Sequence, residues 1–217
     1  MIRPARLVTA VLTASAALLL TACGSGGGGG SSSDDIKGAD TGSGEASADA
    51  SPTASARVIE RPEITLPPTF SMNFESWTNG DPKLQAILDD GRETLRASHA
   101  AVIAADPDAD YVAFYNEGPA LESARTWING FVKTDDSLIG EVDVFDSQVR
   151  INSQGLGVLF YCVNEGKAST KNRKTDKVVG TPADVSPYLQ YRTTLQKTSQ
   201  GLWKTRSVET ERGACGK

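Results

Sequence analysis

Histidine and cysteine are the scarcest reactive residues in this 217-residue chain, which holds one histidine and three cysteines. His99 has no serine or cysteine nucleophile at a recognisable spacing. A zinc site needs several nitrogen or sulfur ligands, and the sequence offers no second histidine and no free cysteine pair. His99 follows Leu95 by four positions, so on a helix it lies near the apolar stripe, where we expect it to pack and not to act as a general base.

Tyrosine and acidic residues are the remaining candidates for acid–base chemistry. Tyrosine hydroxyls can donate hydrogen bonds, and carboxylates can accept protons. None of these residues falls in a known catalytic motif, and the chain has no glycine-rich phosphate loop, dinucleotide fingerprint or metalloprotease motif. We therefore assign no catalytic residue, no metal and no cofactor from the sequence. The candidates are Tyr111, Tyr115, Tyr161 and Tyr191 as donors, and Asp143, Asp146 and Glu165 as bases.

The first 22 residues have the layout of a secretory signal peptide. Arg3 and Arg6 precede an apolar run over residues 7–19, and small residues follow. That run is shorter than the roughly 18 residues that a membrane-spanning helix needs. The signal peptide predicts export to an oxidising compartment.

Cys23 follows this segment directly, and residues 20–23 (Leu-Thr-Ala-Cys) resemble the lipobox of bacterial lipoproteins. The resemblance implies cleavage before Cys23 and a diacylglyceryl group on its sulfur. Two acyl chains hold a protein stably at a membrane, which would place this one at the outer face of the cytoplasmic membrane. The alternative is an ordinary signal peptide cut near Ala22. It would leave an exposed thiol, which is a liability in that compartment.

The composition divides the remaining chain into a tether over residues 23–69 and a domain over residues 70–217. The tether is rich in Gly, Ser, Ala and Asp and lacks aromatic residues. It cannot bury enough apolar surface to order itself, so we expect it to be disordered and to span roughly 35–40 Å. All tryptophans, tyrosines and phenylalanines lie from Phe70 onward, which places the core there.

Periodicity predicts three helices followed by four strands in this domain. The first helix starts with Asp81 as its N-cap and Pro82 at its first position, and it ends at Asp106-Pro107. Two shorter helices are expected over 109–116 and 119–132. The strands are "SLIGEVDVFDSQVRI" with a break in its alternation, "GLGVLFYCVNEG", "PYLQYRTTLQKT" and "LWKTRSVETER". This order predicts an α+β fold in which the helices pack on one face of a curved, mostly antiparallel sheet.

Cys162 lies in the second expected strand and Cys215 just after the last one. If Cys23 is lipidated, these two are the only partners left for each other, so we predict a disulfide between them. The alternative is two free, buried cysteines.

The stretch "VLFYCVNEG…TDKVVG…YRTTLQKTSQGLWKTRSVETERGAC" is similar to the C-terminal half of a group of actinobacterial secreted lipoproteins. These proteins carry a domain of the nuclear transport factor two-like, or cystatin-like, superfamily. The resemblance covers most of residues 81–215. It implies a cone-shaped fold whose bent sheet wraps around the helices and leaves a pocket at the wide end. The candidate pocket residues are Tyr111, Tyr115, Trp127, Tyr161 and Tyr191.

The net charge of −5 argues against a nucleic-acid binder, which normally carries a basic excess. One local exception is the basic segment 167–177. It suits either a solvated hairpin loop, which we favour, or a patch for anionic lipid headgroups or wall polymers.

Three interpretations of function remain open. We favour a lipid-anchored surface protein whose pocket binds a small apolar ligand or an envelope protein without catalysis. The first alternative is an acid–base enzyme of the isomerase or dehydratase type, as some members of the superfamily are. The second is an assembly role in which the sheet face forms a dimer interface.

Overall fold

The structure is a computed structural model and describes residues 59–216. The predicted signal peptide, Cys23 and residues 24–58 of the predicted tether lie outside the described residues.

Three helices form where the sequence periodicity predicts them. Helix α1 spans Pro82–Ala104, and the Asp81 side chain caps it by accepting a hydrogen bond from the backbone N–H of Lys83 at 2.8 Å. It ends at Ala105, whose backbone is left-handed. Helices α2 and α3 follow, over Asp110–Tyr115 and Gly118–Lys133.

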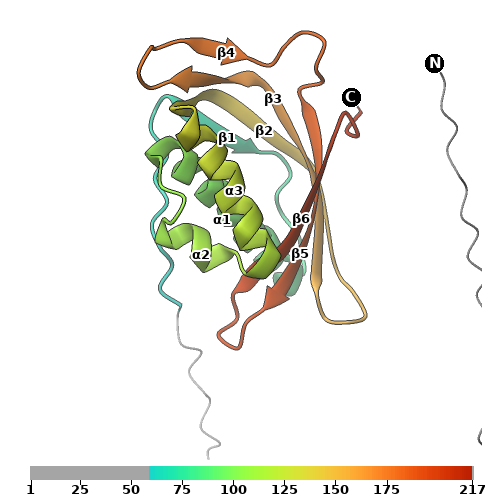
Figure 1. Cartoon of the computed structure of the whole chain (residues 1–217). Coiled ribbons are helices and arrows are strands. Elements are labelled where there is room, and N and C mark those ends of the chain that lie inside the picture. The colour runs from blue at the N-terminus through green and yellow to red at the C-terminus, as the bar shows by residue number, and fades with distance from the viewer. Residues whose placement is uncertain (1–58, 217) are drawn as a thin grey trace, which may run out of the picture. The chain divides into compact units, whose positions relative to one another are not determined.

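The strands form one curved sheet, and the helices lie together on one side of it (Figure 1). Strands β2, β3, β5 and β6 pair antiparallel in that order, and β1 adds a parallel edge beside β2. The short strand β4 pairs with β3 outside this path. The α+β class and the helices packed on a mostly antiparallel sheet are therefore confirmed. The strands span Phe70–Phe74 (β1), Asp136–Ile151 (β2), Gly157–Asn172 (β3), Val178–Gly180 (β4), Tyr188–Lys197 (β5) and Trp203–Arg212 (β6).

Two details of the sheet differ from the sequence prediction. Strands β1 and β4 were not expected, because β1 forms only by pairing with a strand far along the chain and β4 is only three residues long. The basic segment 167–177 is also not a simple loop, since its first six residues continue β3 and the tight turn comes only after Asn172. The predicted break within β2 is confirmed, because the β2–β3 register shifts between Glu141 and Asp143 and again between Phe145 and Gln148.

The core lies between α1 and the inner face of the sheet. Gly91 allows the close approach of α1 to β3, since a Cβ atom there would lie 2.5 Å from the Cδ2 atom of Leu159. Trp77 belongs to the same core, and its indole N–H donates to the backbone carbonyl of Leu88 at 2.7 Å. Its main fully buried members are Ile87, Leu88, Val144, Leu159, Val163 and Leu195.

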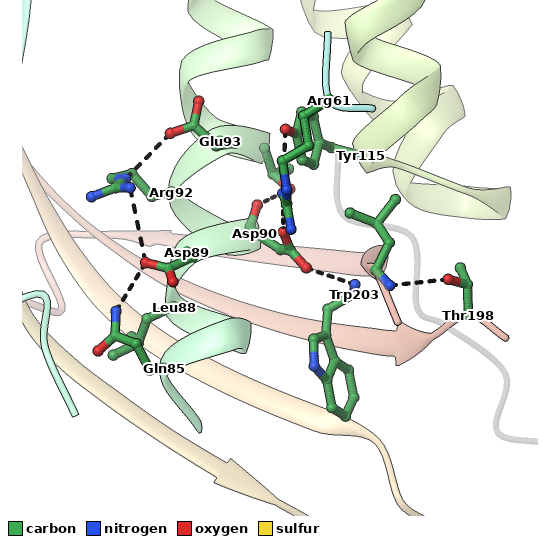
Figure 2. A network of polar contacts seen from close by, with 12 residues as sticks. Arg61, Gln85, Leu88, Asp89, Asp90, Arg92, Glu93, Tyr115, Thr198 and Trp203 are labelled. Atoms are coloured by element: carbon green, nitrogen blue, oxygen red, sulfur yellow. Dashed lines mark hydrogen bonds and ion pairs between the residues drawn. The ribbon is translucent and has the colours of Figure 1, made fainter. Parts of the chain in front are cut away.

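Residues 59–69 pack against the domain, although the sequence assigned them to the disordered tether. We call this segment the N-terminal strap. Ile64 is buried against α1 and α2, and Arg61 forms an ion pair with Asp90 in the middle of α1. The other carboxylate oxygen of Asp90 accepts the backbone N–H of Trp203 at 2.7 Å, so one buried side chain joins strap, helix and β6 (Figure 2). The tether boundary at residue 69 is thus wrong, because a few branched side chains and one ion pair suffice to order the strap.

A disulfide joins Cys162 in β3 to Cys215, with their Cα atoms 6.0 Å apart. It packs with Phe145 and Tyr188 in a small separate cluster and fixes the segment after β6 to the sheet. The predicted pairing is confirmed in the structure.

Candidate ligand-binding site

A cavity of about 290 Å³ lies between the helices and the inner face of β3, β5 and β6. Helix α1 lines it with residues three or four positions apart, which places them on one helical face. Helix α3 does the same with Ala120, Ala124 and Trp127. Because α1 and α3 each turn one stripe toward the sheet, the cavity has two helical walls and a floor of strands. The lining residues of α1 are Gly91, Thr94, Leu95, Ser98 and His99.

The floor follows from the alternation of the strands. Every second residue of β5 points inward, and these residues face inward-pointing partners on β6. The inner face is therefore a mixture of apolar side chains and hydroxyl groups, with one ion pair at its end. Its residues are Tyr161, Glu165, Leu189, Tyr191, Thr193, Thr205, Val208, Thr210 and Arg212.

Tyr161 and Tyr191 form the aromatic centre of this floor. They are direct partners in the β3–β5 register, and their rings stack with centroids 4.9 Å apart and planes at 8°. Burial raises the pKa of both, that of Tyr161 well above its ordinary value, so both hydroxyls keep their protons at physiological pH. Within residues 59–216 neither hydroxyl has a hydrogen-bond partner, which leaves two donors available to a ligand.

His99 lies in the cavity wall in a neutral form. Its Nδ1 atom is 2.8 Å from the backbone carbonyl oxygen of Leu95, and a carbonyl only accepts, so Nδ1 carries the proton and Nε2 is the acceptor. Desolvation lowers the pKa of His99 to about 4. The ring also stacks on Phe70 at 5.6 Å and meets Trp127 edge-on at 5.3 Å. The packing role expected from the sequence is confirmed, and the residue is a cavity-lining acceptor as well.

Glu165 and Arg212 form an ion pair at the end of the cavity, with Oε2 and Nη2 3.1 Å apart. The second terminal nitrogen of Arg212 donates to the backbone carbonyl of Ser186 at 2.7 Å. Opposite charges therefore meet at the cavity wall, and Glu165 and the Ser186 carbonyl together fix the position of the guanidinium.

A second cavity of about 320 Å³ adjoins the first. His99, Trp127, Glu165 and Arg212 line both cavities. The rest of its wall is mostly apolar and comes from β1, α3, β2, β3 and β4. These residues are Phe70, Phe131, Leu138, Val142, Ala168 and Val179, with Ser169, Thr170, Gly180 and Thr181 at its side.

Three of the five predicted pocket residues line the cavity and two do not. Trp127, Tyr161 and Tyr191 are in its wall. Tyr115 is buried elsewhere, beside Phe114, and its hydroxyl accepts a hydrogen bond from Arg61 at 3.4 Å. Tyr111 lies with it in the clusters that α2 forms with α1 and the strap. The prediction for these two tyrosines is wrong because α2 turns its aromatic face toward those elements and not toward the sheet.

Of the three candidate bases, only Glu165 faces the cavity. Asp143 accepts a hydrogen bond from the Asn73 side chain at 3.1 Å on β1, and Asp146 lies exposed at the bulge of β2. Sequence reasoning missed Arg212 as a site residue. The signal that points to it is its register opposite Leu189, an inward position at the end of β6.

Within residues 59–216, no group of three or more His, Cys, Asp or Glu residues is arranged to hold a metal ion. In the same range, no helix is long and apolar enough to cross a membrane.

Comparison with solved structures finds similar chains at low sequence identity. The intermembrane space region of the chloroplast protein ARC6 has a TM-score of 0.45 and 8% identity, and the match covers 63% of this chain and 100% of that one. Aln2 from a Streptomyces species has a TM-score of 0.42 and 15% identity over 62% of this chain and 94% of that one. A protein from Catenulispora acidiphila has a TM-score of 0.40 and 11% identity over 58% and 91%. No family model and no curated protein matches the sequence.

Proposed function

We propose that this domain is a binding module that holds a small, mainly apolar molecule between α1, α3 and the sheet. The observation that carries the proposal is the stacked pair of Tyr161 and Tyr191. Their hydroxyls lie without protein partners among residues 59–216, in a cavity whose remaining wall is apolar surface interspersed with serine and threonine hydroxyls. A concave apolar site with a few converging polar groups is the usual form of a small-molecule site.

The protonation states favour binding over acid–base catalysis. A general acid or base works best with a pKa near the operating pH. His99 is neutral above about pH 4, and both tyrosines remain protonated. Glu165 is occupied by its ion pair with Arg212. The polar groups of the cavity therefore suit hydrogen bonding to a ligand more than proton exchange with a substrate.

The second candidate is an enzyme of the isomerase type, and one observation favours it: the carboxylate of Glu165 shares a cavity wall with His99 and Tyr191. A simple substrate distinguishes the two functions. An isomerase would convert 3-cyclohexen-1-one to its conjugated isomer, followed by ultraviolet absorbance, and Glu165→Gln would abolish turnover. The binding module would give the uncatalysed rate with or without Glu165.

Titration with a fluorescent dye tests the binding function. The full chain is titrated with Nile red, whose fluorescence rises in apolar surroundings. Val208 lines the cavity from β6, so Val208→Phe would fill it and weaken dye binding at least tenfold. Val178 is exposed on β4 and lines neither cavity, so Val178→Phe serves as the matched control and would bind like the wild type. Equal binding by both variants would refute the proposal.

The proposal extends to the setting of the domain, a lipid anchor on Cys23 at the outer face of the cytoplasmic membrane. The support is in the sequence, where the signal peptide layout runs directly into the residues that resemble a lipobox. Cell fractionation tests this part. Cys23→Ala should move the protein from the membrane to the soluble fraction, while a mutant that stays with the membrane would rule the anchor out.

We also place the domain in the nuclear transport factor two-like superfamily as part of this proposal. The sequence resemblance supports it, together with a bent sheet that wraps around helices and encloses a cavity between the two layers.

A further inference from the structure

The two cavities share one wall, which His99, Trp127, Glu165 and Arg212 build together. We infer that the cavities are two compartments of one elongated site, and that this site takes a neutral hydroxylated ring carrying an aliphatic chain. The inference rests on the proposed function and names its ligand class.

The first compartment is suited to a ring with a hydroxyl group. Tyr161 and Tyr191 offer two hydroxyl donors, and His99 offers its Nε2 atom as an acceptor. A hydroxyl accepts from a tyrosine and donates to the histidine, whereas a carbonyl oxygen does only the first. Leu95, Leu189 and Val208 supply apolar contacts for the ring. A phenol-like group therefore satisfies this compartment better than a ketone does.

The second compartment is suited to a hydrocarbon chain. Its wall beyond the shared residues is built mainly from apolar side chains of five different elements. The polar residues there are short, namely Ser169, Thr170 and Thr181. Each methylene that leaves water for such a site adds about three- to fourfold in affinity.

The ion pair between the compartments selects against charged ligands. Glu165 and Arg212 neutralise each other at the shared wall. An anionic head group would meet the Glu165 carboxylate and a cationic one the Arg212 guanidinium, and either would have to compete with the existing partner. A neutral ligand passes the pair without separating the charges, which is the less costly arrangement in a partly buried site.

Titration calorimetry of the full chain with 4-alkylphenols tests the inference. The series runs from 4-ethylphenol through butyl and hexyl to 4-octylphenol at pH 7.4, and 4-octylbenzoate is the charged counterpart. We expect affinity to rise about three- to fourfold per added methylene until the second compartment is full. The benzoate should bind at least tenfold more weakly than 4-octylphenol. A series without a chain-length gain, or a benzoate that binds as tightly as the phenol, would overturn the inference.

Two variants show where the alkyl chain of the ligand lies. Ala168 and Val179 line only the second cavity, and Val179 is half exposed, so Val179→Phe disturbs the core least. In Ala168→Phe and Val179→Phe, the affinity should no longer rise with chain length beyond the ethyl compound. The affinity for 4-ethylphenol should stay within twofold of the wild-type value. Ala183→Phe and Val178→Phe, at exposed positions outside both cavities, should keep the full series. An unchanged series in Val179→Phe, checked as folded by its melting curve, would overturn the two-compartment site.

The outcomes separate this inference from the proposed function. If 4-ethylphenol binds and Val208→Phe removes that binding, the binding module stands even when longer chains gain nothing. If 4-ethylphenol and Nile red both bind Val208→Phe as well as the wild type, the binding module itself is refuted.

Discussion

Arg61 of the N-terminal strap donates a hydrogen bond to the carboxylate of Asp90, whose side chain is only 1% exposed in the middle of α1. The same carboxylate holds the backbone N–H at the start of β6. These contacts make the strap part of the domain. They also explain why a carboxylate is tolerated on the buried face of α1, since both of its oxygens have partners.

Replacing Arg61 should destabilise the fold. Arg61→Ala leaves the Asp90 charge buried without its counter-ion, which costs about 3–5 kcal/mol for a fully buried pair. Because the Arg61 side chain is 45% exposed, we expect a smaller loss of about 1–3 kcal/mol in the free energy of unfolding. Urea denaturation measures it. Arg92→Ala, which removes only partly exposed ion pairs of α1, is the matched control and should cost less than about 0.5 kcal/mol. Equal losses in the two variants would contradict the buried pairing.

His99 should make the stability depend on pH between about 6.5 and 4. Its folded pKa of about 4 lies below the ordinary value of 6.5, so in this window the unfolded chain binds a proton that the folded chain does not. The stabilisation is complete above pH 6.5 and is lost as the pH falls toward 4, by on the order of 3 kcal/mol. Carboxylates also titrate there, so the measurement is the difference between wild type and His99→Gln from pH 7 to pH 4. Parallel stability curves would show that His99 is not held neutral.

The disulfide should stabilise the domain through the 53-residue separation of its cysteines. The chain-entropy estimate for such a loop is on the order of 4 kcal/mol as an upper value. Cys162→Ser should therefore lower the melting temperature by several degrees under oxidising conditions. Dithiothreitol should bring the wild type down to the same temperature and leave the variant unchanged. A wild-type melting temperature that does not change with dithiothreitol would contradict the disulfide.

In the basic turn after β3, we expect Arg173 to contribute to stability and Lys174 to contribute almost nothing. The Arg173 guanidinium donates to the backbone carbonyl of Val102 at 2.5 Å, near the end of α1, and to that of Asp136 on β2. Arg173→Ala should cost about 1 kcal/mol of unfolding free energy, since it frees helix-end carbonyls. Lys174→Ala breaks only an exposed ion pair with Asp135 and should cost almost nothing. A membrane or polymer role of this turn would instead show as lost binding to anionic vesicles in Lys174→Ala, with no change in stability.

The parts of the fold that local sequence determines were predictable. Asp81 and Pro82 mark the start of α1, and the spacing of its apolar residues gives its length. The continuous apolar run of β3 gives a central strand. Strand β1 was not predictable, because its five residues become a strand only through parallel pairing with β2, about 70 residues later.

The strap and the cavity depend on contacts that no local pattern encodes. Arg61 and Asp90 are 29 residues apart, and the strap has the composition of a linker apart from a few branched side chains. Tyr161 and Tyr191 were proposed as pocket residues from their hydroxyl groups and from the family resemblance, and they line the cavity because their strands place them as partners on the inner face of the sheet. Tyr111 and Tyr115 were misplaced because periodicity shows that α2 has an aromatic face without showing which neighbour it meets.

The location of a bound ligand tests the central claim most directly. Methyl-labelled full chain is titrated with 4-ethylphenol, and the methyl shifts of leucine and valine are followed by nuclear magnetic resonance. We expect the methyl groups of Leu95, Leu189 and Val208, which line the cavity, to shift and saturate together. The exposed methyl groups of Val178 and Val185 should stay in place. Shifts confined to those two valines, or no saturable shift at Leu95, Leu189 and Val208, would contradict a ligand site between the helices and the sheet.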